Sequence, residues 1–460
     1  MKKLTVTLLI ATVLNVANVF AQDCDYSGTT GPLQWCLKDG TLTISGTGAM
    51  PDYEYPNHAP WYEYRESIVA VVMENGVTTI GIYAFRDCTS LTAVTILNSV
   101  TTIGDFAFST CTSLTAVTIP NSVTTIGYAA FRSCTSLTAI DVASGNNSYA
   151  SETGILFDKN KTTLICYPAG KTTTSYMIPN SVTTIGSFAF GYCTSLTSIT
   201  IPNSVTMIGS YAFFYCTSLT SITIPNSVTM IGNYAFYSCT SLTSITIPNS
   251  VTTIGNYAFS TCTSLTSVTI PNSVTTIGER AFSFCSSLAT VTIPNSVTTI
   301  GSYAFGYCTS LTSITNLNPV PVEINSSVFN EVNQSECTLE VPKGSVSAYQ
   351  NAEVWKEFKI IGIEVGIETI TNDESQITVY PNPTSGVLLV KTQLLRQAQQ
   401  PIASLQDVEI FDMMGRMVYT AKTRFIASLQ DDTTILDISC LPSGIYFVRI
   451  AGKTVRFVKE

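Results

Sequence analysis

Cysteine is the residue type whose chemistry and spacing first suggest a function for this chain. Of its 14 cysteines, most follow one another at intervals of 23 residues, broken by one gap. The periodic series consists of Cys88, Cys111, Cys134, Cys193, Cys216, Cys239, Cys262, Cys285 and Cys308. Thiols can form disulfides, bind metals or act as nucleophiles.

The spacing of these cysteines argues against disulfide bonds between them and against a metal site. Equivalent residues in successive turns of a repeat have parallel Cα–Cβ bonds, whereas a disulfide requires two Cβ atoms that face each other at about 3.8 Å. Tight clusters such as Cys-x-x-Cys, which would suit a metal, are absent from the sequence. We therefore expect buried, unpaired thiols at these positions, with no metal and no cofactor.

Histidines and paired carboxylates, the other usual catalytic groups, show no recognisable catalytic arrangement in the sequence. His58 is the single histidine, and it lies in the Pro-rich stretch 55–60, where a surface or packing role is expected. Between residues 77 and 316 the chain has six acidic and six basic residues, scattered without regular spacing. We expect no catalytic residues and no enzyme, although the irregular stretch 141–178 leaves room for a site.

The elements that carry the cysteines are copies of one 23-residue unit, and such a period is typical of a solenoid. In the unit from 216 to 239, Leu-x-x-Ile-x-Ile predicts a short strand, Pro225-Asn226 a turn, and 228–231 a second extended segment. The spacing of 234–239 predicts one helical turn. The residues expected to face inward are Leu219, Ile222, Ile224, Val228, Ile231, Ala235, Phe236 and Cys239.

The repeated pattern Ile-Gly-x-x-Ala-Phe-x-x-Cys-x-x-Leu-x-x-Ile-x-Ile-Pro resembles the BspA-type leucine-rich repeat, over residues 61–361. The resemblance implies a leucine-rich-repeat solenoid with short parallel strands. Residues 22–76 would form an N-terminal cap and a first irregular repeat. Within the solenoid at 77–361, residues 141–178 resemble an irregular longer unit, and 317–361 a closing unit.

The N-terminus reads as a secretory signal peptide over residues 1–21, with two lysines, an apolar run and a small-residue cleavage site. No later stretch is long and apolar enough to span a membrane. Export favours a disulfide between Cys24 and Cys36, which lie close together in the predicted cap. The sequence leaves this pair open between a disulfide and two free thiols.

The C-terminal part reads as an acidic linker at 362–376 followed by a small all-β domain at 377–460, of the immunoglobulin-like sandwich type. Three motifs in it, in this order, resemble the type IX secretion (type A) sorting domain. The motif residues are Tyr380, Pro381, Asn382, Pro383, Gly386, Gly415, Arg416, Pro442, Gly444 and Tyr446. The resemblance implies secretion across the outer membrane of a Gram-negative bacterium through the type IX machinery.

A surface rich in hydroxyls and poor in charge remains as the functional feature. Charged residues make up 12% of the chain and the net charge is −9, which excludes a nucleic-acid partner. One ladder of aromatic residues recurs two residues after each repeat glycine, interrupted by Ala129 and Arg280, and is expected to pack along the edge of the stack. The variable aromatic residues near the cysteines are the candidate ligand contacts: Tyr192, Tyr215, Tyr237, Phe284 and Tyr307.

These features favour a non-enzymatic, adhesin-like binding protein whose solenoid contacts a host or bacterial surface protein or glycan. The resemblance to the BspA-type family implies the same class of function. A self-associating structural protein of the envelope is the main alternative. A third hypothesis, an ice-binding array of threonines, is weaker, because threonine also recurs in strands for its β-propensity alone.

Overall fold

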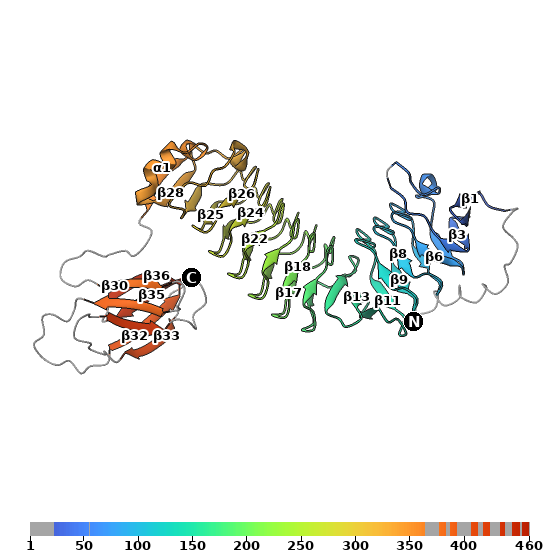
Figure 1. The fold of residues 1–460 in the computed structure, drawn as a ribbon, viewed down its shortest axis with the longest axis horizontal. Coiled ribbons are helices and arrows are strands. Elements are labelled where there is room, and N and C mark those ends of the chain that lie inside the picture. Colours follow the sequence, from blue (N-terminus) through green and yellow to red (C-terminus); the bar gives the residue numbers. More distant parts are fainter. Residues whose placement is uncertain are drawn as a thin grey trace, which may run out of the picture.

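The computed structural model describes residues 23–54 and 56–363, and the backbone of seven further strands towards the C-terminus. The predicted signal peptide at 1–21 and most of the predicted linker lie outside the described residues. Residues 23–363 form an elongated, curved solenoid, with the turns stacked one on the next (Figure 1).

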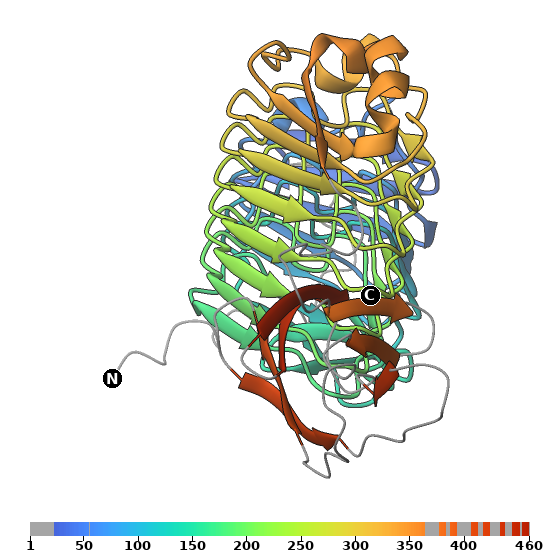
Figure 2. The same ribbon diagram turned by 90° about the vertical axis from the view of Figure 1, so that its left-hand side faces the viewer.

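Two columns of short parallel strands run along the solenoid (Figure 2), one for each extended segment of the repeat. Equivalent residues pair in register, as Ser198 does with Ser221 and Thr184 with Met207. The first column contains β5 (Ala70–Met73), β7 (Ala93–Thr95), β9 (Ala116–Ile119), β11 (Ala139–Val142), β15 (Ser175–Met177), β17 (Ser198–Thr200), β19 (Ser221–Thr223), β21 (Ser244–Thr246), β23 (Ser267–Thr269), β25 (Thr290–Ile293) and β27 (Ser313–Asn316). The second contains β6 (Val77–Ile80), β8 (Thr102–Ile103), β10 (Thr125–Ile126), β14 (Thr163–Cys166), β16 (Thr184–Ile185), β18 (Met207–Ile208), β20 (Met230–Ile231), β22 (Thr253–Ile254), β24 (Thr276–Ile277) and β26 (Thr299–Ile300). The predicted solenoid of parallel strands is confirmed.

The core is a set of rows, each built from one repeat position. All the residues predicted to face inward in the unit from 216 to 239 are buried. The phenylalanine of each Ala-Phe pair stacks on its equivalents, with ring centroids 5.1 Å apart between Phe190 and Phe213 and 5.0 Å apart between Phe213 and Phe236. Each unit therefore buries its apolar row against copies of itself.

The predicted helical turn is wrong for the regular units. In the segment 234–239, Ala235, Tyr237 and Cys239 donate their N–H groups to the carbonyl three residues earlier, while Tyr234, Phe236 and Ser238 donate to the next turn of the stack. Tyr234 and Ser238 have positive φ angles of 56° and 57°, which do not occur in a right-handed helix. The apolar spacing matched one turn of helix, but the alternating bonds form a third inter-turn ladder, which we call the turn ladder.

The glycine of each Ile-Gly pair is needed for close packing of successive turns. It is not needed for a left-handed turn, because Gly232 does not adopt a positive φ. A Cβ at Gly232 would lie 2.7 Å from the backbone carbon of Gly209 and 2.7 Å from the nitrogen of Ser210. The glycine is therefore required because the backbones of successive turns approach too closely for a side chain.

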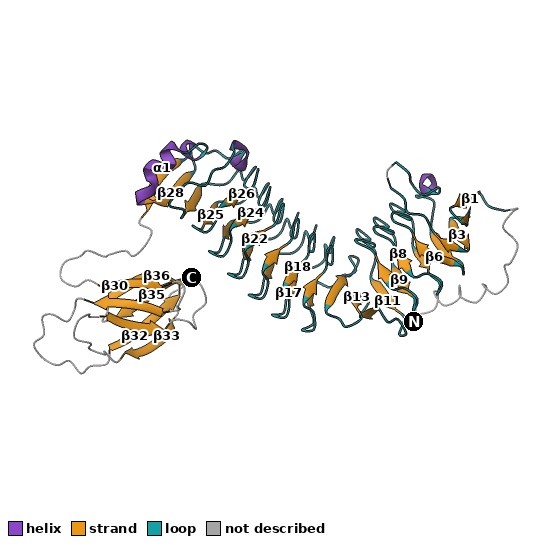
Figure 3. Cartoon of the chain, in the orientation of Figure 1, coloured by secondary structure: helices purple, strands orange, loops and turns teal. Residues whose placement is uncertain are grey.

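Irregular elements close both ends of the solenoid, and the described helices lie there (Figure 3). At the N-terminal end are β1 (Tyr26–Thr30), β2 (Leu33–Lys38), β3 (Thr41–Gly46), β4 (Gly48–Ala49) and η1 (Tyr62–Tyr64). At the other end are η2 (Ser326–Phe329), β28 (Thr338–Pro342), η3 (Lys343–Ser345), α1 (Val346–Asn351), η4 (Trp355–Glu357) and β29 (Lys359–Ile363). These elements cover the apolar faces that the outermost turns would otherwise expose.

A hairpin interrupts the stack in the stretch 141–178. Its strands β12 (Tyr149–Glu152) and β13 (Ile155–Asp158) are antiparallel, and β13 also pairs antiparallel with β14. The buried residues form two clusters that meet here, because Ile155 and Phe157 belong to the C-terminal cluster and Leu156 to the N-terminal one. The irregular unit therefore joins two separately packed stacks.

The C-terminal part contains two antiparallel sheets, with strand orders β30-β31-β34 and β33-β32-β35-β36. The strands are β30 (Ile377–Asn382), β31 (Val387–Thr392), β32 (Gln406–Asp412), β33 (Met417–Thr423), β34 (Thr433–Asp437), β35 (Gly444–Ile450) and β36 (Lys453–Lys459). The elements described in this part of the chain are all β-strands.

Replacing Gly232 by alanine will lower the free energy of unfolding by about 1–3 kcal/mol, because the new methyl group must push two stacked backbones apart. Denaturant unfolding of the purified protein measures the change. Gly344→Ala is the matched control, because a Cβ there has no atom within 4 Å. Equal effects of the two substitutions would contradict the close-approach explanation.

Candidate functional site

The periodic cysteines lie in the core and carry no exposed chemistry. All nine of the series are free and buried, which confirms the prediction of unpaired thiols. In seven of the nine the S–H group donates to the phenylalanine carbonyl of the preceding turn, at 3.0 Å from Cys216 to Phe190 and 3.2 Å from Cys239 to Phe213. Cys193 donates to the Tyr167 carbonyl instead. Burial raises the pKa of the Cys216 thiol to about 12. Each cysteine therefore acts as a small core residue, and those whose S–H group donates also join two turns.

The aromatic ladder, defined as the second residue after each repeat glycine, packs along the edge of the stack as predicted. Ring centroids of Tyr211, Tyr234 and Tyr257 follow one another at 4.6 and 4.4 Å in parallel stacks. Arg280 replaces one ring and lies between Tyr257 and Tyr303, 5.3 and 4.7 Å from their centroids. These contacts use the ring faces, so the ladder is mainly structural.

The predicted ligand contacts fall into two separate groups, which we call the outer aromatics. Tyr192 stacks on Tyr215 at 5.3 Å, and Tyr237 stacks on Phe214 at 5.1 Å. Two units further on, Phe284 stacks on Tyr307 at 4.3 Å. Between the groups the position before cysteine holds small residues, Ser238 and Thr261. The sequence did not single out Phe214, which links the first group because it also contacts Tyr215 at 4.7 Å.

Two of the outer aromatics are more exposed than the ladder, whereas the other three, Tyr192, Tyr237 and Tyr307, are partly buried like the ladder tyrosines. Tyr215 is 37% and Phe284 47% exposed, and both have positive φ angles, as the residue before cysteine does in every regular unit. The backbone strain is thus a property of the repeat and gives no sign of function at these two positions. The exposed rings of Tyr215 and Phe284 do indicate a function, because large apolar side chains at a surface are available to a partner.

The first strand column presents the hydroxyl face that the sequence predicted. Ser198, Thr200, Ser221 and Thr223 are exposed. Neighbouring threonines use their hydroxyls within the molecule: Thr220 donates to the Thr197 carbonyl at 3.1 Å, and Thr206 to that of Thr183 at 3.4 Å. These rows therefore satisfy the backbone, which weakens the case for an array that orders water.

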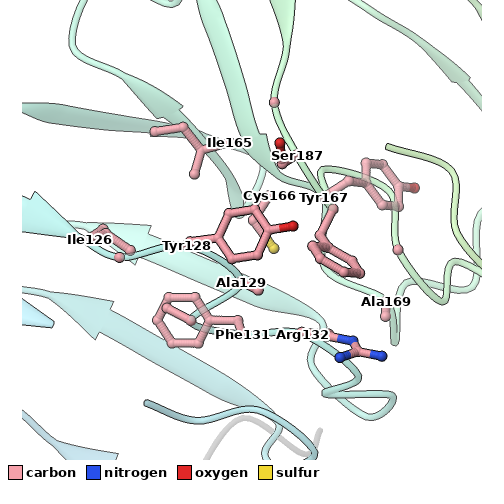
Figure 4. A pocket seen from close by; sticks show the side chains of 15 residues that line it. Ile126, Tyr128, Ala129, Phe131, Arg132, Ile165, Cys166, Tyr167, Ala169 and Ser187 are labelled. Atoms are coloured by element: carbon pink, nitrogen blue, oxygen red, sulfur yellow. The ribbon is translucent and has the colours of Figure 1, made fainter. Parts of the chain in front are cut away.

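A pocket of about 260 Å³ lies where the irregular unit interrupts the turn ladder (Figure 4). Its walls come from residues 126–132 on one side and from 165–169 and 186–191 on the other. Among its lining residues, Arg132 is the charged one. The ladder interruption at Ala129 and the irregular unit are both visible in the sequence, but their position side by side is visible only in the fold.

Catalytic and metal-binding groups do not gather in the part of the chain that the structure describes. His58 stacks on Tyr62, with ring centroids 4.0 Å apart. In residues 23–54, 56–363 and the described strands, no three His, Cys, Asp or Glu side chains lie close enough to hold a metal. Cys166 in the pocket wall has its pKa raised to about 12 by burial, so its thiol is protonated at neutral pH and is a poor nucleophile.

The remaining predicted residues lie at the two ends of the chain. Cys24 and Cys36 form a disulfide bond in the structure, which ties the start of the described chain to β2. Of the sorting-motif residues, Tyr380, Pro381 and Asn382 lie in β30, and Gly444 and Tyr446 lie in β35. The other five, Pro383, Gly386, Gly415, Arg416 and Pro442, lie outside the described residues. None of the described helices is long and apolar enough to cross a membrane.

Comparison with protein families gives two matches that together span most of the chain. The family described as BspA type leucine rich repeat region matches residues 60–163, 166–286 and 229–354. The family described as secretion system C-terminal sorting domain matches residues 378–460. No curated protein matches the chain.

Several solved structures resemble the solenoid. A leucine-rich repeat protein from Eubacterium ventriosum is 34% identical over 62% of this chain and 88% of its own, with a TM-score of 0.49. The pneumococcal vaccine antigen PcpA is 20% identical over 75% of this chain and 100% of its own, with a TM-score of 0.47. A leucine-rich cell surface protein from Faecalibacterium prausnitzii is 25% identical over 64% and 96%, with a TM-score of 0.34.

Thermal stability will fall as the pH rises above about 9. Burial raises the pKa of the Cys216, Cys262 and Cys308 thiols from 9.0 to about 12. Between these values the unfolded chain releases protons that the folded chain retains, so alkaline pH favours unfolding. Thermal melts in the presence of a reductant between about pH 8 and pH 11 measure the effect.

Cys216→Ala is the control for this pH dependence. It removes one of the titrating thiols and reduces the slope of unfolding free energy by about 1.4 kcal/mol per pH unit in the alkaline range. A melting temperature that stays constant up to about pH 11 would contradict the assignment of these thiols as buried and protonated.

Proposed function

The chain belongs to the BspA-type leucine-rich repeat family and ends in a secretion-system sorting domain, and we propose that it is a non-enzymatic, adhesin-like protein. In this proposal the solenoid binds a protein or glycan on a host or bacterial surface. The sorting domain implies secretion to the cell surface or the extracellular space. A binding function needs an exposed, rigid surface, which a stack of identical turns supplies.

The observation that carries the proposal is the exposure of the Tyr215 and Phe284 rings on a surface with little charge. Side chains such as Tyr215 and Phe284 bury a large apolar area on binding and lose little conformational entropy, which is why aromatic residues dominate binding hot spots. The hydroxyls around them can form hydrogen bonds with a protein or a sugar. Two groups of rings, two units apart, would give the surface two anchor points.

The C-terminal sorting domain supports a route to the outside through the type IX machinery. In this proposal residues 1–21 direct passage through the inner membrane of a Gram-negative bacterium, and residues 377–460 direct passage through the outer membrane. Residues 22–76 serve as the cap, 77–361 as the solenoid and 362–376 as the linker. The two antiparallel sheets of the tail suit an immunoglobulin-like sandwich.

Removing the outer aromatics will reduce binding by at least about tenfold, because residues of this kind contribute about 2 kcal/mol or more at hot spots. The variant carries Tyr215→Ser, Phe284→Ser and Tyr307→Ser. Binding of the secreted protein to host cells, matrix proteins, bacterial cells and a glycan array is compared with that of the unchanged protein.

The matched control replaces Met207 and Met230 by serine. These side chains are 46% and 47% exposed on the second strand column, so the control removes a similar exposed apolar surface elsewhere. Equal losses in both variants would contradict the assignment of the outer aromatics. If the unchanged protein binds none of these surfaces, the adhesin proposal fails, and concentration-dependent light scattering would then favour the self-associating structural protein.

Deleting residues 377–460 will retain the protein in the periplasm, because the type IX machinery reads this domain. Cell fractionation and labelling of surface proteins in the native host measure its location. A deletion restricted to 229–251, which removes one repeat, is the control and should reach the surface. Normal surface display without the tail would refute its role.

A further inference from the structure

The pocket at the irregular unit arises from a two-residue shortening of one turn. Leu164 pairs with Ile185, and Tyr167 takes the place of Phe190, because it stacks on that ring and donates its N–H to the Ala189 carbonyl at 2.7 Å. Two residues separate Leu164 from Tyr167, whereas four separate Ile185 from Phe190. The irregular turn therefore lacks the equivalents of Ser187 and Phe188.

The shortening leaves backbone groups of the turn ladder without their usual partners. In the preceding turn Phe106 donates its N–H to the Tyr128 carbonyl at 2.9 Å. The equivalent N–H of Ala129 has no acceptor among the described residues, and the ladder N–H groups of Phe131 and Ser133 in the same turn have none there either. On the other side, the Ser187 carbonyl lacks the donor that its equivalent, the Ser210 carbonyl, receives from Phe188. A donor and an acceptor thus face the pocket from opposite walls.

The aromatic ladder is also vacant here over two successive turns. Ala129 supplies a methyl group where the ladder usually has a ring, and the next position is deleted. Tyr128 partly covers the vacancy, because its ring contacts Phe106 and Phe188 edge-on, both at 5.5 Å. About 260 Å³ remains, which is near the lower end of the range for ligand pockets.

Arg132 gives the pocket a positive charge that no described side chain neutralises. The other arginines of residues 23–363, Arg65, Arg86 and Arg280, each form an ion pair with a carboxylate. Arg132 has no such pair among the described residues, and its buried Nε has no hydrogen-bond partner there. Its guanidinium lies 5.0 Å from the Phe188 centroid and donates to the Tyr192 hydroxyl at 3.4 Å. Guanidinium groups in such apolar surroundings bind carboxylates strongly.

We propose that this pocket binds an extended peptide segment that carries an aromatic side chain next to a carboxylate. The peptide carbonyl accepts from Ala129 and the peptide N–H donates to Ser187, which restores the interrupted ladder by strand addition. The aromatic ring packs against Ala129 and Tyr128 in the space that remains, and the carboxylate contacts Arg132. The carboxylate is either the C-terminus of the peptide or an acidic side chain. This inference goes beyond the adhesin proposal, because it does not depend on the exposed rings of Tyr215 and Phe284; of the outer aromatics, Tyr192 contacts Arg132.

The test measures peptide binding to the full-length protein by fluorine NMR. Four probes are compared: acetyl-Gly-Gly-(4-fluoro-Phe) with a free carboxylate, its C-terminal amide, the amide of acetyl-Gly-(4-fluoro-Phe)-Asp-Gly, and fluorinated glucuronate. Binding of the first probe alone identifies a C-terminal carboxylate, and binding of the third identifies an acidic side chain. Binding of glucuronate without either acidic peptide, or equal binding of the amide lacking a carboxylate, would overturn the proposal, as would the absence of all binding.

Two variants locate the site. Ala129→Tyr places a ring in the vacancy and should abolish binding; it should also fold, because Ala129 has a φ of 53°, like Phe106 and Tyr211 at the equivalent positions (53° and 61°). Arg132→Gln should weaken binding about 10- to 100-fold, as expected for loss of a charge-assisted hydrogen bond. Arg280→Gln, which alters a similar stacked arginine in the ladder, should leave binding unchanged. Thermal melts verify folding, and unchanged binding by both folded pocket variants would overturn the proposal.

Discussion

The hydrogen bonds between successive turns are the interaction on which the rest of this structure depends. Each turn must satisfy its backbone groups on the turn before and the turn after, at three places around the coil. This requirement fixes the 23-residue length, brings the backbones so close at positions such as Gly232 that a side chain is excluded, and aligns every apolar row with itself. It also explains the pocket, because a turn that is two residues short cannot bond its neighbour along its whole length.

Much of the fold could be predicted from the sequence because each position of the repeat occurs many times, which makes its preference for apolar residues clear. Leu219, Ile222 and Phe236 were placed in the core from spacing alone, and all are buried. The conformation of 234–239 could not be predicted, because the left-handed φ of Tyr234 is imposed by bonds to the next turn and tyrosine gives no local sign of it. For the same reason, the role of the repeat glycine emerged only from the distance between two backbones.

The candidate site was less predictable than the fold. Residues such as Tyr215 and Phe284 stand out in the sequence because they vary within a regular pattern, and the structure places both at the surface. The pocket depends instead on two departures, Ala129 and the short segment 164–167, which lie far apart in the sequence and meet only when the turns are stacked. Arg132 is a candidate binding residue because no carboxylate of the described residues lies beside it, and the spacing of residues in the sequence does not reveal this. The sequence signal that could have found this site is the count of residues between Leu164 and Tyr167.

The nearest-neighbour character of the stack has a genetic consequence. Because equivalent residues such as Ser221 and Ser244 pair in register, one unit can be gained or lost between residues 193 and 308 without altering either end or the hairpin. Unequal recombination between such similar coding segments would lengthen or shorten the protein in whole steps of one strand spacing, about 4.8 Å. The distance between the hairpin and the C-terminal end of the solenoid can therefore change within a population, one repeat at a time, while the fold stays the same.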